Sequence, residues 1–178
     1  MDEIVKEALR KWPNVPDVRG WLGLDARGRW FLRDERVRAA GPFPEVKGSL
    51  IEHGKLVDFI GRNYEADETG CWFFQNGPQR VYVELEAAPW VWRVQWLDNS
   101  ALLTTHTGIE AQGVREALVD DDGRLFLDAP PRFGIVHSQD IHDAAQALEA
   151  GTWPAVRTLS FDEMPARFGY VLRPAREG

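Results

Sequence analysis

An Asp-x-x-Gly turn followed by an aromatic-rich apolar segment occurs three times in this chain and constrains its fold more than any other feature. The three copies span residues 25–32, 67–74 and 120–127. Asp favours the first position of a type I turn, where its carboxylate accepts a backbone N–H, and Gly three residues later adopts the left-handed conformation that returns the chain. The sequence therefore predicts a protein of repeated β-hairpins, and this feature specifies no chemistry.

Hydrophobic periodicity extends this prediction along the chain. We predict helices at residues 2–12, 53–64 and 140–150, the last beginning at Asp140, and a short capping box from Ser160 to Glu163. A turn between strands is the alternative for residues 53–64, and residues 35–48 are predicted as a loop. Strands are predicted at residues 20–25, 29–34, 71–75, 80–86, 90–97, 101–106, 116–119, 124–128, 133–137 and 170–172.

These elements predict a single α+β domain over residues 1–178. Meandering hairpins with aromatic interiors favour a mostly antiparallel β-sheet that curls into a barrel or half-barrel, with two or three peripheral helices. Residues 77–83 and 129–135 are also alike. Duplicated β-hairpin units near residues 20–106 and 115–172 would explain this, and so would convergence on one common turn.

The charge and cysteine content exclude several functional classes. The net charge of −7 argues against a nucleic-acid binder, which needs a basic surface. Cys71 is the only cysteine, which excludes an intramolecular disulfide and fits a reducing compartment. The N-terminus is acidic where a signal peptide would be basic, and no apolar stretch approaches membrane length. We therefore expect a cytoplasmic protein that is not bound to a membrane.

The hairpin around Asn76-Gly77 presents the strongest candidate for a binding site. A two-residue Asn-Gly loop would place Trp72 opposite Val81 and Phe73 opposite Arg80. One face of the hairpin would then be core. The other face would combine aromatic rings with charged groups; its candidate ligand-binding residues are Phe73, Gln75, Arg80 and Tyr82.

Such a face suits a ligand with a flat apolar part and an anionic group, since Arg pairs with carboxylates and stacks on rings. In the more common arrangement, Phe73 and Tyr82 pack under a helix and Arg80 pairs with Glu84 or another acid. We expect a non-enzymatic binding module for a small anionic or aromatic ligand or for a partner peptide. No P-loop, dinucleotide fingerprint or nucleophile elbow is present, and we expect no cofactor.

Four histidines offer an alternative function. His137 and His142 flank Asp140 at a predicted strand-to-helix junction, and His106 could supply a further ligand. These residues would make a metal-dependent hydrolase. Their spacing matches no established zinc signature, so we first expect that the protein has no metal site.

A third hypothesis concerns Trp90, Trp92 and Trp96, which alternate along one predicted strand. An exposed stripe could form the interface of a homo-oligomer. Three exposed Trp side chains would favour aggregation, so burial of the stripe is the preferred interpretation. Val91, Arg93 and Gln95 would then face outward.

Three segments resemble a family of proteobacterial proteins known only as a domain of unknown function. They are Gly20-Trp-Leu-Gly-Leu-Asp-Ala-Arg-Gly-Arg-Trp30, Arg62-Asn-Tyr64 and Trp72-Phe-Phe-Gln-Asn-Gly-Pro-Gln-Arg-Val-Tyr-Val83. The resemblance covers about the first hundred residues. It implies a soluble bacterial protein and supplies no activity, cofactor or site residue.

Overall fold

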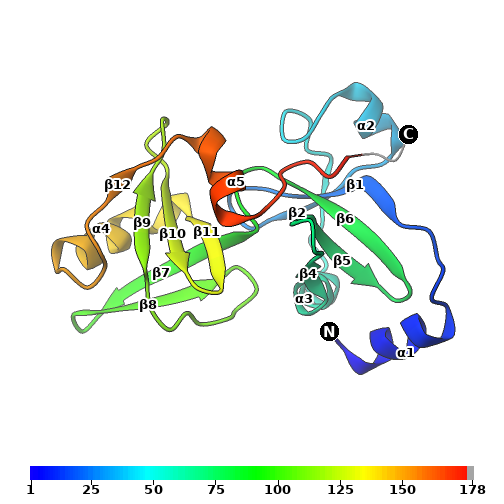
Figure 1. Cartoon of the computed structure of the whole chain (residues 1–178), viewed down its shortest axis with the longest axis horizontal. Coiled ribbons are helices and arrows are strands. Elements are labelled where there is room, and N and C mark those ends of the chain that lie inside the picture. Colours follow the sequence, from blue (N-terminus) through cyan, green and yellow to red (C-terminus); the bar gives the residue numbers. More distant parts are fainter. Residues whose placement is uncertain (176–178) are drawn as a thin grey trace. The chain divides into compact units, whose positions relative to one another are not determined.

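The computed structural model describes residues 1–175, which form two compact units (Figure 1). Unit 1 comprises Met1–Asp25, Arg29–Glu86 and the chain from Gly169, and unit 2 comprises Ala26–Gly28 and Ala87–Phe168. Each unit contains one six-stranded sheet. The fold is therefore α+β.

Unit 1 is built on a sheet of strand order β3-β2-β1-β6-β5-β4. Neighbouring strands are antiparallel except for β1 and β6, which are parallel. Its strands are β1 (Val18–Leu24), β2 (Trp30–Leu32), β3 (Ser49–Leu50), β4 (Tyr64–Ala66), β5 (Trp72–Asn76) and β6 (Gln79–Leu85). Its helices are α1 (Glu3–Lys11), α2 (Glu35–Ala40) and α3 (Gly54–Arg62).

Helix α3 packs on β5, with the Phe59 and Phe74 rings edge to face at 5.6 Å between centroids. It begins after His53, whose Nδ1 accepts the Leu56 N–H. The structure thus resolves the ambiguity at residues 53–64 in favour of the predicted helix.

Unit 2 is built on a sheet of strand order β12-β9-β10-β11-β7-β8. Parallel pairs join β11 to β7 and β12 to β9, and the other pairs are antiparallel. Its strands are β7 (Trp90–Leu97), β8 (Ser100–Thr105), β9 (Glu116–Val119), β10 (Leu125–Ala129), β11 (Arg132–Val136) and β12 (Arg157–Thr158). Its helices are α4 (Ile141–Glu149) and α5 (Met164–Phe168), each preceded by a short 3-10 turn, η1 (Ser138–Asp140) and η2 (Phe161–Glu163).

Helix α4 packs on β7 and β8 and closes the core of unit 2 (Figure 1). Trp92 is fully buried there, and its indole Nε1 donates to the Leu127 carbonyl at 3.0 Å. Trp90 is also buried and Trp96 is half-buried. The Trp stripe is therefore largely interior, as preferred above, and supplies no exposed interface. Val91, expected to face outward, is fully buried.

The three Asp-x-x-Gly segments form the predicted hairpin turns, joining β1 to β2, β4 to β5 and β9 to β10. In each copy the Asp N–H donates to the carbonyl four residues later, and the N–H of that later residue donates to the Asp Oδ1. The glycine of the first, second and third copy has a φ of +76°, +84° and +77°, respectively. These positive values lie in the region that favours glycine. Local side-chain chemistry thus explains all three turns.

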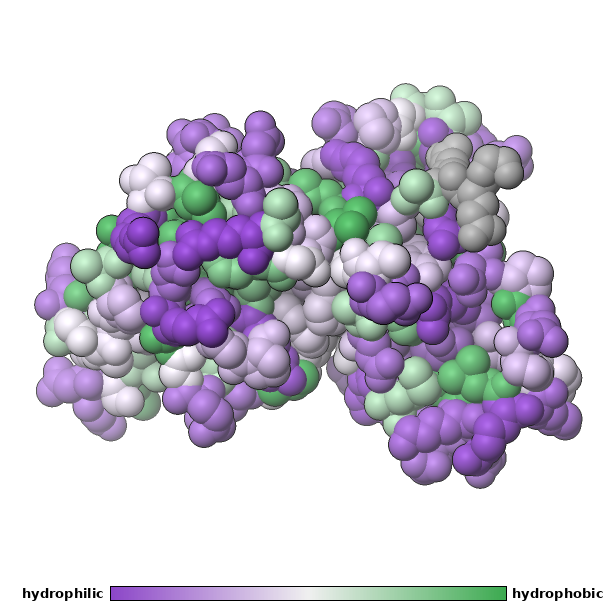
Figure 2. Space-filling view, viewed as in Figure 1, coloured by the Kyte–Doolittle hydropathy of each residue, from purple (hydrophilic) through white to green (hydrophobic). Residues whose placement is uncertain are grey.

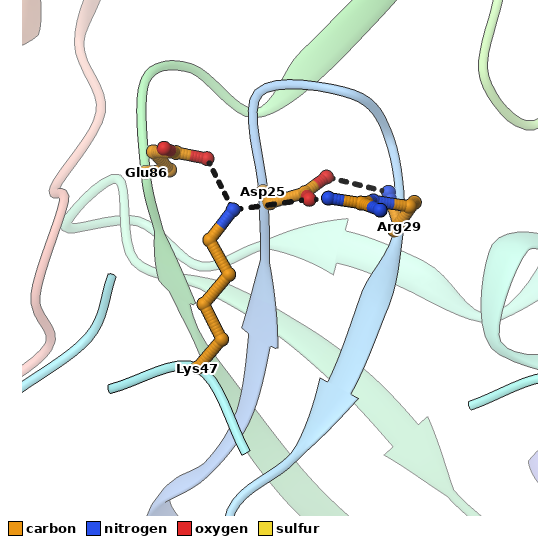
Figure 3. Close-up of polar contacts among 4 residues, drawn as sticks. All are labelled: Asp25, Arg29, Lys47 and Glu86. Atoms are coloured by element: carbon orange, nitrogen blue, oxygen red, sulfur yellow. Dashed lines mark hydrogen bonds and ion pairs between the residues drawn. The ribbon is translucent and has the colours of Figure 1, made fainter. Parts of the chain in front are cut away.

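The copies differ at the second carboxylate oxygen of the Asp. In the first and third, this oxygen accepts the Nε of the Arg four residues later, Arg29 at 2.8 Å and Arg124 at 2.7 Å. In the first, Lys47 also reaches Asp25 and lies 3.5 Å from Glu86 (Figure 3). The middle copy has Cys71 at the Arg position, and Asp67 accepts the Tyr82 hydroxyl instead.

Several sequence predictions need correction. Each sheet ends in two edge strands, so neither closes, and the predicted barrel or half-barrel is not confirmed. The predicted loop at residues 35–48 contains α2, whose cap is Asp34 accepting the Val37 N–H. Residues 170–172 are not a strand, although Val171 and Leu172 hydrogen-bond to Gly70 and Leu85.

The two predicted capping side chains have other partners. Asp140 makes no side-chain cap for α4 and pairs with Arg93 instead. Ser160 donates its hydroxyl to Asp121 and does not cap η2. Both side chains therefore link distant parts of unit 2 and do not cap a helix.

The surface of the molecule is largely polar on the face in Figure 2, where hydrophobic side chains gather in small groups. None of the helices within residues 1–175 is long and apolar enough to cross a membrane.

Candidate functional site

The four predicted contact residues lie on neighbouring strands and on one face of the β5–β6 hairpin. Phe73 pairs with Tyr82 and Gln75 with Arg80. The hairpin loop is Gly77-Pro78, one residue beyond the predicted Asn76-Gly77, so every predicted pair is displaced by two residues. Because side chains alternate with a period of two, this displacement leaves the membership of each face unchanged.

These residues form a compact network whose polar groups already have partners. The Arg80 guanidinium lies 4.0 Å from the centroid of the Phe73 ring and 3.4 Å from the Tyr82 hydroxyl. Tyr82 donates to Asp67 at 2.9 Å, and Gln75 donates to the Gly77 carbonyl at 3.0 Å. Phe73, Gln75 and Tyr82 are buried, and Arg80 is half-buried. The network therefore links the two strands of the hairpin, and its half-buried members are Arg80 and Asp67.

The ionisation of Asp67 follows from these contacts. Burial acts to raise the pKa of this carboxyl, but hydrogen bonds from Thr69, Tyr82 and the backbone outweigh it and lower the pKa below 3.8. Burial raises the pKa of the Tyr82 phenol, and the neighbouring Asp67 carboxylate raises it further. The pair is therefore a phenol donating to a carboxylate.

Because of this pair, we expect the stability of the fold to decrease at acidic pH. A carboxyl whose folded-state pKa is lowered stabilises the fold above its unfolded-state pKa, and that contribution is lost as the pH falls through the folded-state value. We expect Asp67→Asn to lower the free energy of unfolding at pH 6 by about 1 kcal/mol. The difference from wild type should shrink well below pH 3.8. Urea denaturation at pH 6 and pH 3 measures it, with the exposed Asp58→Asn as control; a difference that grows in acid would contradict the assignment.

The residues of the metal hypothesis have separate partners. His137 accepts the Gln139 N–H, and Asp140 pairs with Arg93 at 2.6 Å. His142 bonds to Gln146, and His106 accepts the Val91 N–H. Within residues 1–175 no three His, Cys, Asp or Glu side chains form a group that could hold a metal ion.

An apolar groove lies on the opposite face of the β5–β6 hairpin, entirely within unit 1. Its volume is about 370 Å³, within the range of small-ligand sites. The sheet supplies its floor and α3 one wall. Its lining is apolar apart from two amides near the hairpin loop: Val18, Trp21, Leu22, Leu32, Ile51, Leu56, Ile60, Phe74, Asn76, Gln79 and Val81.

Three large side chains of the groove remain accessible: Leu32 is 50% exposed, Leu56 41% and Trp21 38%. The Arg38 guanidinium stacks on Trp21, 4.5 Å from the ring centroid. Within the described residues, the buried Arg38 Nε has no hydrogen-bond partner and the Arg38 guanidinium forms no ion pair with a carboxylate. The groove therefore combines exposed apolar surface with an uncompensated cation beside it.

Sequence reasoning missed this groove because Phe74 and Val81 lie on the face assigned to the core. One signal was available. Trp21, Leu32 and Leu56 are large apolar residues, and a core already rich in aromatics does not need all of them.

A family comparison covers nearly the whole chain. The model of the DUF2944 family, described as "Protein of unknown function (DUF2946)", matches residues 1–175. The chain belongs to this family. The resemblance seen in the first hundred residues is thus confirmed, and the DUF2944 match extends it through unit 2. No curated protein matches the sequence.

Two crystal structures of DUF1285 family proteins are similar to this DUF2944 chain. One, from Silicibacter pomeroyi DSS-3, is 14% identical with a TM-score of 0.50, over 79% of this chain and 74% of that one. The other, from Shewanella baltica OS155, is 13% identical with a TM-score of 0.47, over 70% of this chain and 90% of that one. The first likeness concerns the fold alone.

Proposed function

We propose that the protein is a cytoplasmic, non-enzymatic binding module whose apolar groove takes a ligand with an aromatic or aliphatic body and an anionic group. The observation that carries the proposal is the groove beside Arg38, with exposed Trp21 and Leu32 in its lining. Apolar burial supplies affinity at about 25 cal/mol per Å². An anion paired with the guanidinium supplies orientation.

The residues predicted from sequence have a supporting role in this proposal. Phe73, Arg80 and Tyr82 hold the hairpin from one face, while Phe74 and Val81 present the groove on the other. A hairpin locked on one side keeps the groove open before a ligand arrives, which lowers the cost of binding.

The proposal is tested with two fluorescent probes that differ in charge. 8-Anilinonaphthalene-1-sulfonate carries an aromatic body and an anion, and N-phenyl-1-naphthylamine lacks the sulfonate. We expect both to bind the full chain and Leu32→Glu to weaken both about tenfold, which corresponds to about 1.4 kcal/mol. Arg38→Ala should weaken the sulfonate several-fold and leave the uncharged probe unchanged.

Leu97→Glu is the matched control. Leu97 ends β7 as Leu32 ends β2, is 61% exposed and lies outside the groove. Equal loss of binding in the two Glu variants, or no binding by wild type, would refute the proposal.

A further inference from the structure

The two units repeat one strand arrangement. In unit 1, β4, β5 and β6 form a meander, and in unit 2, β9, β10 and β11 form the same meander 53 positions later. The pairing registers correspond: Tyr64 with Phe74 matches Ala117 with Leu127. The last strand of each meander then pairs in parallel with the first strand of its unit, β1 or β7.

This register identifies equivalent positions on the two sheets. Phe74 corresponds to Leu127 by the 53-residue spacing. Leu22 corresponds to Trp92, because each pairs with the equivalent residue of the parallel neighbour, Val83 in β6 and Val136 in β11. The face that forms the groove in unit 1 is therefore the face that carries Trp92 and Leu127 in unit 2.

In unit 2 a helix covers that face. Helix α4 follows β11 through η1 and packs on β7 and β8. Its Ala144 and Ala147 are fully buried in one core cluster with Trp92 and Leu127. Small residues on this side let the helix approach the sheet closely.

Acidic side chains fasten the start of α4 to β7. Asp140 accepts from Arg93 and from the Val94 N–H, and Asp143 accepts from the Trp96 N–H at 3.0 Å. The helix thus combines an apolar face with acids along its edge.

Among the described residues of unit 1, no helix occupies the corresponding place. β6 ends at Leu85 and the chain continues to β7 at Trp90 with no helix between. Helix α3 packs on β5 and leaves Trp21 of β1 and Leu32 of β2 exposed. Arg38, stacked on Trp21, forms no ion pair with an acid within the described residues.

We infer that the groove of unit 1 is the docking site for an amphipathic α-helix of a partner protein, which lies on β1 and β2 as α4 lies on β7 and β8. The inference rests on the proposed binding function and specifies its ligand. The helix carries apolar residues at i, i+3, i+4 and i+7, the usual pattern of a helix in a groove. An acidic residue at its edge pairs with Arg38, since Arg binds carboxylates through paired hydrogen bonds.

A helical peptide library displayed on phage tests this inference. Its members are 14-residue, alanine-based peptides with varied apolar residues at i, i+3, i+4 and i+7 and with Glu, Gln or Lys at two flanking positions. Selection on the immobilised full chain should enrich Glu-flanked members. Binding should fall about tenfold on Leu32→Glu and stay unchanged on Leu97→Glu. A central Pro should abolish it, because Pro breaks a helix. Arg38→Glu should reverse the preference from Glu to Lys.

Two results would overturn the inference: no enrichment, or enriched peptides that tolerate the central Pro. The naphthalene probes separate this failure from failure of the proposed function. If the probes bind in a Leu32-dependent manner and no helical peptide does, the groove is a small-ligand site and only the helix is wrong. If the probes do not bind either, the proposed function is wrong as well.

Discussion

Replacing Glu84 by alanine is expected to lower the free energy of unfolding by about 3 kcal/mol, since removing one partner of a buried ion pair leaves a buried charge uncompensated. Arg33 lies on the segment after β2, and its side chain is 2% exposed against 14% for Glu84. The two groups are 2.9 Å apart. The guanidinium also donates to the carbonyls of Gly41 and Val46, so it anchors the segment after α2 to the sheet.

Urea denaturation at neutral pH measures this effect. Glu65→Ala is the matched control, because Glu65 is an exposed strand residue of the same unit, and we expect it to change stability by less than about 0.5 kcal/mol. Glu84→Gln retains an acceptor for Arg33 and should fall between the two. Equal stability of the two alanine variants would mean that the Arg33 charge is compensated elsewhere.

Replacing Trp92 by alanine is expected to cost about 3–5 kcal/mol, the usual range for removing a large buried aromatic side chain. Trp92 is fully buried between the unit 2 sheet and α4. A Cβ added to Gly134 would lie 2.9 Å from the indole Nε1, which shows how closely the ring covers this strand. Its loss would leave a cavity and remove one hydrogen bond to the Leu127 carbonyl.

Trp92→Phe separates these two contributions. It retains most of the aromatic volume and loses the hydrogen bond, so we expect a cost of about 1–2 kcal/mol. Trp12→Ala is the control, because Trp12 follows α1 and is 51% exposed. Chemical denaturation monitored by far-ultraviolet circular dichroism compares the variants without relying on Trp fluorescence. If Trp92→Ala cost no more than Trp12→Ala, the described core would be wrong.

The elements that sequence reasoning located well are those set by local chemistry. The strands at residues 90–97 and 116–119 have the predicted bounds, and Asp67 and Asp120 make the turns expected of them. The missed elements are short. β3 and β12 have two residues each, β4 has three and α2 has six, too few to show a hydrophobic period.

The candidate site was predicted only in part. Phe73, Gln75, Arg80 and Tyr82 do share one face, because the period of two survives a two-residue error in register. Their accessibility was not predictable, since it depends on what packs above them. The groove on the opposite face requires residues from β1, β2, α3, β5 and β6 together, and no local pattern brings these segments side by side.

By itself, the sequence determined the hairpins and their turns, because an Asp carboxylate and a glycine at fixed spacing act within five residues of chain. It also determined that the Trp90–Trp96 strand would be core, because so much apolar surface must leave water. Only the tertiary structure decided the parallel pairing of β1 with β6 and of β7 with β11, which joins segments far apart in the chain. It also decided that α4 covers one sheet while Trp21 and Leu32 stay exposed on the other, because covering a sheet face requires a helix delivered there by the path of the whole chain.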